Sequence, residues 1–159
     1  MFRTRLPGLA TALVALIATV GVAPGATARP RLRPDHGTAA VATTPRTSGA
    51  TQYVAGFDFD AILGPTAITY VIKAIPTSAK DTFSLVADRV ILYTGTGELS
   101  GTATARLTAR AGGQASVTAG KLTLTTGRGS LAGHSLRASF SGTGRLGAGY
   151  TFTYHGTYR

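Results

Sequence analysis

Asp58 and Asp60, in the segment Gly-Phe-Asp-Phe-Asp-Ala, are the closest pair of acidic residues in the chain. On a β-strand, residues two apart share one face and lie about 6.6 Å from each other. Such a pair could bind calcium or supply the acid and base of a glycosidase. Glycosidase carboxylates normally come from separate elements across a cleft, so we favour another interpretation. In it, the pair faces water on an edge strand while Phe57 and Phe59 pack inward.

The chain has three histidines, His36, His134 and His155, and we do not expect them to form one site. His36 lies in a segment without strand patterning. The other two lie in a predicted C-terminal hairpin in which even-numbered residues face the interior, so His134 points inward and His155 outward. Two histidines on opposite faces do not share a metal ion. We interpret His134 as a hydrogen-bonded residue at the rim of the interior rather than as a catalytic base.

This hairpin consists of two alternating runs joined by a turn at residues 143–147. In the register that we expect, Phe140 lies opposite Tyr150, which places His134 near Gly156. The inward residues of the closing strand are aromatic. Together with His134 they are the predicted contacts for a small ligand: Tyr150, Phe152 and Tyr154.

Other catalytic and cofactor chemistry has no support in the sequence. The chain has no cysteine, which excludes a disulfide framework, thiolate zinc sites, iron–sulfur clusters and a cysteine nucleophile. Serine is plentiful, but the G-x-S-x-G elbow of a hydrolase is absent. We therefore predict no catalytic residue, no metal ligand and no cofactor, and we favour a function without catalysis.

The elements that must position these residues are β-strands. Apolar and polar residues alternate with a period of two through most of residues 51–159, and no segment has the pattern of a long amphipathic helix. Seven or eight strands joined by glycine-rich connections predict an all-β fold, a single antiparallel barrel of about eight strands, with a β-sandwich as the alternative. The expected alternating runs are 52–60, 66–75, 82–93, 99–110, 114–119, 122–125, 136–140 and 150–154.

A glycine-rich motif of the form G-x-G-x-L-x-G occurs at residues 95–101 and again at 127–133, with a looser copy at 142–147. In such positions glycine supplies positive φ in a turn and room at a bend. The run from Leu122 to Ser135 is similar to the strand, G-T-G-x-[YF]-x-G, strand segment of allene-oxide-cyclase-like and dirigent-like barrels. The aromatic closing strand also resembles the last strands of those families. The resemblance implies an eight-stranded antiparallel barrel and a hydrophobic cavity, and it carries over no catalytic residue.

The N-terminal part of the chain has the pattern of an export signal followed by a tail. Residues 1–28 begin with two arginines, continue with an apolar run and end in small residues, the order of a secretory signal peptide cleaved after Ala28. Residues 29–50 are basic and rich in Pro, Thr and Ala, so we predict a disordered tail. The mature protein is then secreted, has no membrane span, and folds as a barrel-like domain over residues 51–159. The bias toward Ala, Thr, Gly and Arg is typical of GC-rich bacteria.

The chain is strongly basic, with 16 Lys and Arg against 6 Asp and Glu and a net charge of +10. A basic outer face attracts polyanions such as anionic cell-envelope polymers. We do not expect nucleic acid as a partner, because the predicted strands leave their aromatic residues inside rather than exposed for base stacking. The predicted polyanion-binding residues lie on the outward face of their strands: Arg106, Arg110, Lys121 and Arg137.

Three functions fit these features. The first is non-catalytic binding of a small apolar ligand or of an anionic cell-envelope polymer. The second is a cyclase-like or coupling-guiding barrel enzyme, as the family resemblance implies. The third is a structural module that assembles through strand edges. The sequence leaves the oligomeric state open.

Overall fold

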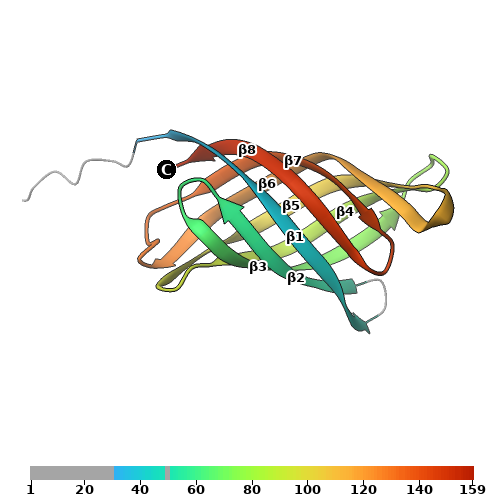
Figure 1. Cartoon of the computed structure of the whole chain (residues 1–159), viewed down its shortest axis with the longest axis horizontal. Helices are drawn as coiled ribbons and strands as arrows, with labels where there is room; N and C mark the ends of the chain where they lie inside the picture. The colour runs from blue at the N-terminus through green and yellow to red at the C-terminus, as the bar shows by residue number, and fades with distance from the viewer. Residues whose placement is uncertain (1–30, 49–50) are drawn as a thin grey trace, which may run out of the picture.

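The computed structural model describes residues 31–48 and 51–159, and this part of the chain is almost entirely β-structure (Figure 1). It contains eight strands and one short 3-10 helix at Ala111–Gly113. None of its helices is long and apolar enough to cross a membrane. The predicted signal peptide, residues 1–28, lies outside the described residues. The strands are β1 Arg33–Ser48, β2 Thr51–Asp60, β3 Gly64–Pro76, β4 Thr82–Tyr93, β5 Gly97–Ala109, β6 Gln114–Gly129, β7 Leu136–Arg145 and β8 Gly149–Tyr158.

Each strand pairs antiparallel with the next along the chain, and β8 returns to pair with β1. The ladder therefore closes into an eight-stranded barrel, which confirms the predicted fold and excludes the β-sandwich. Figure 1 shows the strands running obliquely around a long axis, with turns gathered at two ends. We call the end with the C-terminus and the β2–β3, β4–β5 and β6–β7 turns the closed end. The opposite end, with the β1–β2, β3–β4, β5–β6 and β7–β8 turns, is the open end.

The closed end is filled with aliphatic side chains. Leu92 and Leu99, from β4 and β5, and Leu124 and Leu136, from β6 and β7, are each 0% exposed. Leu131, in the β6–β7 turn, belongs to the same cluster. Burying a leucine side chain stabilises a fold by about 2 kcal/mol. The closed end therefore supplies much of the hydrophobic stabilisation.

The two copies of the glycine-rich motif lie side by side at the closed end. Gly97 pairs with Gly129, and Leu99 pairs with Gly127. A side chain at Gly127 would collide with the backbone of Leu131. Glycine therefore lets the chain turn closely over the barrel end, and each motif places its leucine in the core.

The prediction that residues 29–50 form a disordered tail is wrong for residues 33–48. This segment is β1, which pairs with β2 on one side and β8 on the other and so closes the barrel. Its inward residues Asp35, Ala39 and Val41 are buried, and they alternate with exposed ones. Small side chains suffice here because the backbone is hydrogen-bonded to a strand on each side. The folded domain therefore includes β1, and a domain that starts at residue 51 would lack its closing strand.

Strand β6 differs from the prediction of two separate runs, 114–119 and 122–125. It is one continuous strand of 16 residues. Its register with β7 shifts after Val117, where Ala119 has a positive φ of 49°. Such a bulge adds a residue to one strand. As a result Val117 and Leu122 are both buried, although one number is odd and the other even.

The predicted register of the β7–β8 hairpin is also wrong. Phe140 pairs with Tyr154 and not with Tyr150, because the turn is formed by residues 146–148 and not by 143–147. The shift is by an even number of residues, so it leaves the inward and outward faces unchanged. The aromatic residues of β8 therefore still point into the barrel.

Candidate functional site

The open end of the barrel is hollow. Its space, which we call the outer hollow, has a volume of about 350 Å³. Leu146, in the β7–β8 turn, contributes to its wall and is 47% exposed, so the hollow meets solvent at this end. Several side chains point into it yet are only half-buried, because no other side chain fills the space between them: Tyr70, Ile72, Phe83, Leu85, Tyr150 and Phe152.

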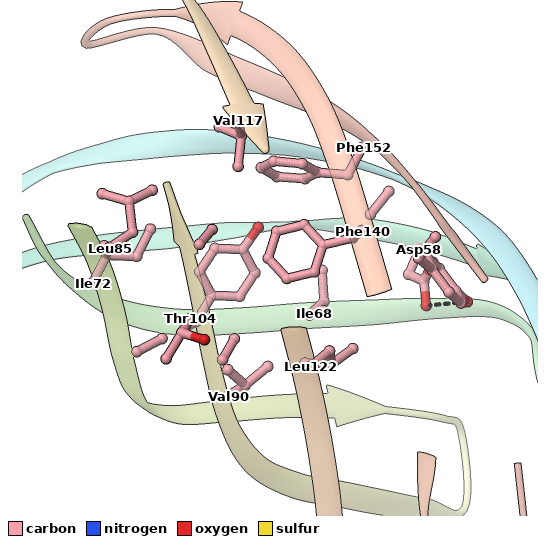
Figure 2. A pocket seen from close by; sticks show the side chains of 16 residues that line it. Asp58, Ile68, Ile72, Leu85, Val90, Thr104, Val117, Leu122, Phe140 and Phe152 are labelled. Carbon is pink, nitrogen blue, oxygen red and sulfur yellow. Dashed lines mark hydrogen bonds between the residues drawn. The ribbon is translucent and has the colours of Figure 1, made fainter. Parts of the chain in front are cut away.

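A smaller inner cavity of about 80 Å³ adjoins the outer hollow on the side of the closed end. The wall of the inner cavity is almost entirely aliphatic and aromatic, and Figure 2 shows Ile68, Leu122 and Phe140 around it. Of the described Asp and Glu residues, only Asp58 lines it. The interior is thus an apolar channel that ends at a carboxyl group. The two spaces share five lining side chains, Tyr70, Ile72, Leu85, Val117 and Phe152.

Three carboxyl groups, which we call the carboxyl cluster, are buried together beside the inner cavity. They belong to Asp35 on β1 and to Asp58 and Asp60 on β2, and they are 2%, 1% and 5% exposed. The hydroxyl oxygen of Tyr154 lies 2.8 Å from Asp60 Oδ2 and 3.1 Å from Asp58 Oδ2. The Tyr154 hydroxyl is therefore within hydrogen-bond distance of both carboxyl groups. The Thr66 hydroxyl donates a longer hydrogen bond of 3.4 Å to Asp58 Oδ2.

The prediction that Asp58 and Asp60 face water while Phe57 and Phe59 pack inward is therefore wrong. The two phenylalanines are 68% and 58% exposed on the outer face of β2. The two carboxyl groups are buried because hydrogen-bond donors meet them inside the barrel. Besides Tyr154, two backbone N–H groups of the β2–β3 turn donate to Asp60 Oδ1, each at 2.7 Å.

Burial raises the pKa of two members of the cluster. The pKa of Asp58 rises to about 6, mainly through burial, and the negative charge of Asp60 adds to this while the hydrogen bond from Tyr154 opposes it. The pKa of Asp35 rises to about 7, again through burial first and then through the neighbouring Asp60 carboxyl. Two buried carboxyl oxygens of the cluster, Asp35 Oδ2 and Asp58 Oδ1, have no hydrogen-bond partner.

The position of Tyr154 depends on Gly37. The two residues are paired across β8 and β1, and a side chain at residue 37 would collide with the Tyr154 ring and hydroxyl. The ring can therefore cross β1 and reach the carboxyl groups of β2. Burial and the nearby carboxylates raise the pKa of Tyr154, so its hydroxyl stays protonated and acts as a donor.

Three of the four predicted ligand contacts line the interior. Tyr150 faces the outer hollow, Tyr154 faces the inner cavity and Phe152 faces both spaces. Their role in binding stays a prediction.

His134 does not lie where we predict it. It is in the β6–β7 turn at the closed end, and Ala138, not His134, pairs with Gly156. Its ring stacks on Tyr158 with 5.2 Å between ring centroids, and its Nδ1 lies 3.0 Å from the carbonyl oxygen of Arg159. The long turn after β6 takes His134 off the strand and away from the cavity. It is a structural contact of the closed end.

The four predicted polyanion-binding residues are all exposed. Arg106, Lys121 and Arg137 lie on the outer face of β5, β6 and β7, and Arg110 follows the end of β5. Their role in binding also stays a prediction.

The part of the chain that the structure describes contains no group of three His, Asp or Glu side chains able to hold a metal ion. No family model, curated protein or solved structure matches the chain. The resemblance to allene-oxide-cyclase-like and dirigent-like barrels therefore stays a prediction.

Proposed function

We propose that this protein binds one small apolar molecule inside the barrel without transforming it. The observation that carries the proposal is the contrast between the two barrel ends. Leucines at the closed end are fully buried, whereas aromatic and aliphatic side chains at the open end point inward and remain half-buried. Protein interiors are normally packed without such voids. An apolar ligand would cover this surface and gain about 25 cal/mol for each Å² removed from water.

The shape of the interior indicates the shape of the ligand. The outer hollow, at about 350 Å³, is within the size range of sites for small molecules. The inner cavity, at about 80 Å³, accepts only a narrow group. We therefore expect a ligand with a broad apolar body and one slender end directed toward Asp58. Export by the predicted signal peptide would place this binding outside the cell.

Binding of N-phenyl-1-naphthylamine, a neutral dye that fluoresces in apolar surroundings, tests the proposal. Ala105 lines the inner cavity on β5, and Ala105→Phe fills space that the ligand needs. The matched control is Ala40→Phe on the exposed outer face of β1. We expect the wild-type protein and the control to bind the dye, and Ala105→Phe to bind at least tenfold more weakly while its circular dichroism spectrum is unchanged. Equal binding by all three proteins, or binding by none, would contradict the proposal.

A cyclase-like or coupling-guiding reaction is the second candidate, and one observation favours it. Asp58 brings a carboxyl group with a pKa of about 6 to the end of an apolar cavity. An acid with a pKa near the working pH can donate a proton to a bound substrate. The NMR spectrum of a ligand recovered after incubation separates the two candidates. An unchanged ligand supports binding alone, and a product that the wild type forms and Asp58→Asn does not supports catalysis.

Assembly through strand edges has little support. β8 pairs with β1 from Arg33 to Ala42, so in residues 31–48 and 51–159 the barrel closes and lacks the two full-length free edges of an open sheet. A second copy would have to contact the outer face of the barrel instead.

A further inference from the structure

Charge is unevenly distributed along the chain. All 6 acidic residues lie at or before Glu98, and from there to the C-terminus the sequence has seven Lys and Arg residues and no acid. Three of the acids are the buried carboxyl cluster, whose members are each 5% exposed or less. The Lys and Arg side chains of β6, β7 and β8 are therefore not accompanied by any acidic side chain on these three strands.

Strand register arranges three of these cations in a line. Lys121 on β6 pairs with Thr104 on β5 and with Ser139 on β7. Arg106 lies two residues beyond Thr104 toward the open end, and Arg137 lies two residues before Ser139 toward the closed end. Diagonal neighbours in regular register, such as Lys121 and Arg137, lie about 7–8 Å apart. Between Lys121 and Arg106 the register shifts, and Arg106 pairs with Thr118. Arg106, Lys121 and Arg137 thus form a diagonal row across β5, β6 and β7, which we call the basic stripe.

The basic stripe is free to bind a partner. Its three side chains are exposed. The ion pairs of the described residues lie elsewhere, between Lys73 and Asp88 and between Arg128 and Glu98. The stripe also borders a surface hollow, to which Lys121 and Arg137 contribute together with hydroxyl and histidine residues and with Asp35, which is 2% exposed: Thr123, Ser139, Thr157, His36 and His155.

We propose that the basic stripe binds a linear phosphate polymer that carries no aromatic bases. Arginine and lysine side chains are suited to phosphate groups, and flanking hydroxyls donate to phosphate oxygens. Proteins that bind single-stranded nucleic acid also present exposed aromatic rings on which the bases stack. The exposed Tyr and Phe residues of the described chain lie on β2 and β4 rather than on the strands of the stripe: Tyr53, Phe57, Phe59 and Tyr93. The stripe lies on the outer face, so this inference is independent of the ligand proposed for the barrel interior.

Titration with inorganic polyphosphate, followed by calorimetry at several salt concentrations, tests the inference. The stripe variant removes three charges from β5, β6 and β7 with Arg106→Gln, Lys121→Gln and Arg137→Gln. The control variant removes the same charge from exposed positions on the β3–β4 side with Lys73→Gln, Lys80→Gln and Arg89→Gln. Both variants have the same net charge, so a difference between them reports on position alone.

We expect the stripe variant to bind polyphosphate at least tenfold more weakly than the wild type and the control variant to change less than threefold. The slope of log affinity against log salt concentration should fall by about 2 in the stripe variant, since each lost phosphate contact contributes about 0.7–0.9. Equal losses in the two variants would overturn the inference, as would no binding by the wild type. Tighter binding of single-stranded DNA than of polyphosphate would instead assign the stripe to nucleic acid.

Discussion

The carboxyl cluster predicts an unusual dependence of stability on pH. The pKa of Asp58 is about 6 in the folded protein and has an ordinary value of 3.8. The folded state therefore binds more protons than the unfolded state between these values, and the unfolding free energy falls as the pH rises. The contribution of Asp58 is fully present below about pH 4 and is lost as the pH passes about 6. At about 1.4 kcal/mol for each pKa unit, it amounts to about 2 to 3 kcal/mol.

Asp58→Asn removes this titration while keeping the shape of the side chain. Urea unfolding followed by far-ultraviolet circular dichroism at pH 4 and pH 7 gives the change in unfolding free energy for each protein. We expect the fall between the two pH values to be smaller in Asp58→Asn than in the wild type by about 2 kcal/mol. Asp88→Asn, which changes an exposed carboxyl group paired with Lys73, should leave the fall unchanged. An identical fall in Asp58→Asn and in the wild type would refute the argument that the Asp58 carboxyl is buried with a raised pKa.

Three further predictions concern the packing of the barrel. Gly37→Ala should lower the unfolding free energy, measured by urea unfolding, by about 2 kcal/mol because the added methyl group collides with Tyr154. In the control Gly95→Ala the methyl group meets no atom within 4 Å, so the unfolding free energy should change by less than about 0.5 kcal/mol. In the same assay, Leu124→Ala at the closed end should lower the unfolding free energy by about 3 kcal/mol, and Leu85→Ala at the half-empty open end by about 1 kcal/mol. Equal losses would contradict the difference in packing between the two ends. A chain without β1 should aggregate through the unpaired edges of β2 and β8, so size-exclusion chromatography that finds it folded and monomeric would show that β1 is dispensable.

The alternation of side chains predicts the barrel because strand faces are a local property. The inward aromatic face of β8 is predicted correctly even though the hairpin register is shifted, since an even shift preserves the faces. β1 is not predicted, because a strand that closes a barrel can be built from Gly, Ala and Thr. The position of β1 in the barrel depends on its backbone hydrogen bonds to β2 and β8. The amino-acid composition of a segment does not reveal such long-range pairing.

The carboxyl cluster could not be predicted from the local pattern around β2. In Phe57-Asp58-Phe59-Asp60 the aromatic residues look like the core face, and burying a carboxyl group is costly without donors. The donor that decides the outcome is Tyr154, which lies 94 residues from Asp60 in the sequence. One sequence feature is related to the cluster: the small inward residues of β1. Among them, Gly37 leaves room for the Tyr154 ring to reach the carboxyl groups.

The most direct test of the proposed apolar ligand site is a methyl NMR titration of the wild-type protein with N-phenyl-1-naphthylamine. Ile72 and Leu85 line both the outer hollow and the inner cavity, whereas Leu99 and Leu136 are fully buried at the closed end. We predict chemical-shift changes at Ile72 and Leu85 that saturate with dye concentration, with little change at the two closed-end leucines. Saturable dye binding that leaves Ile72 and Leu85 unshifted would place the ligand outside the barrel and contradict the proposal.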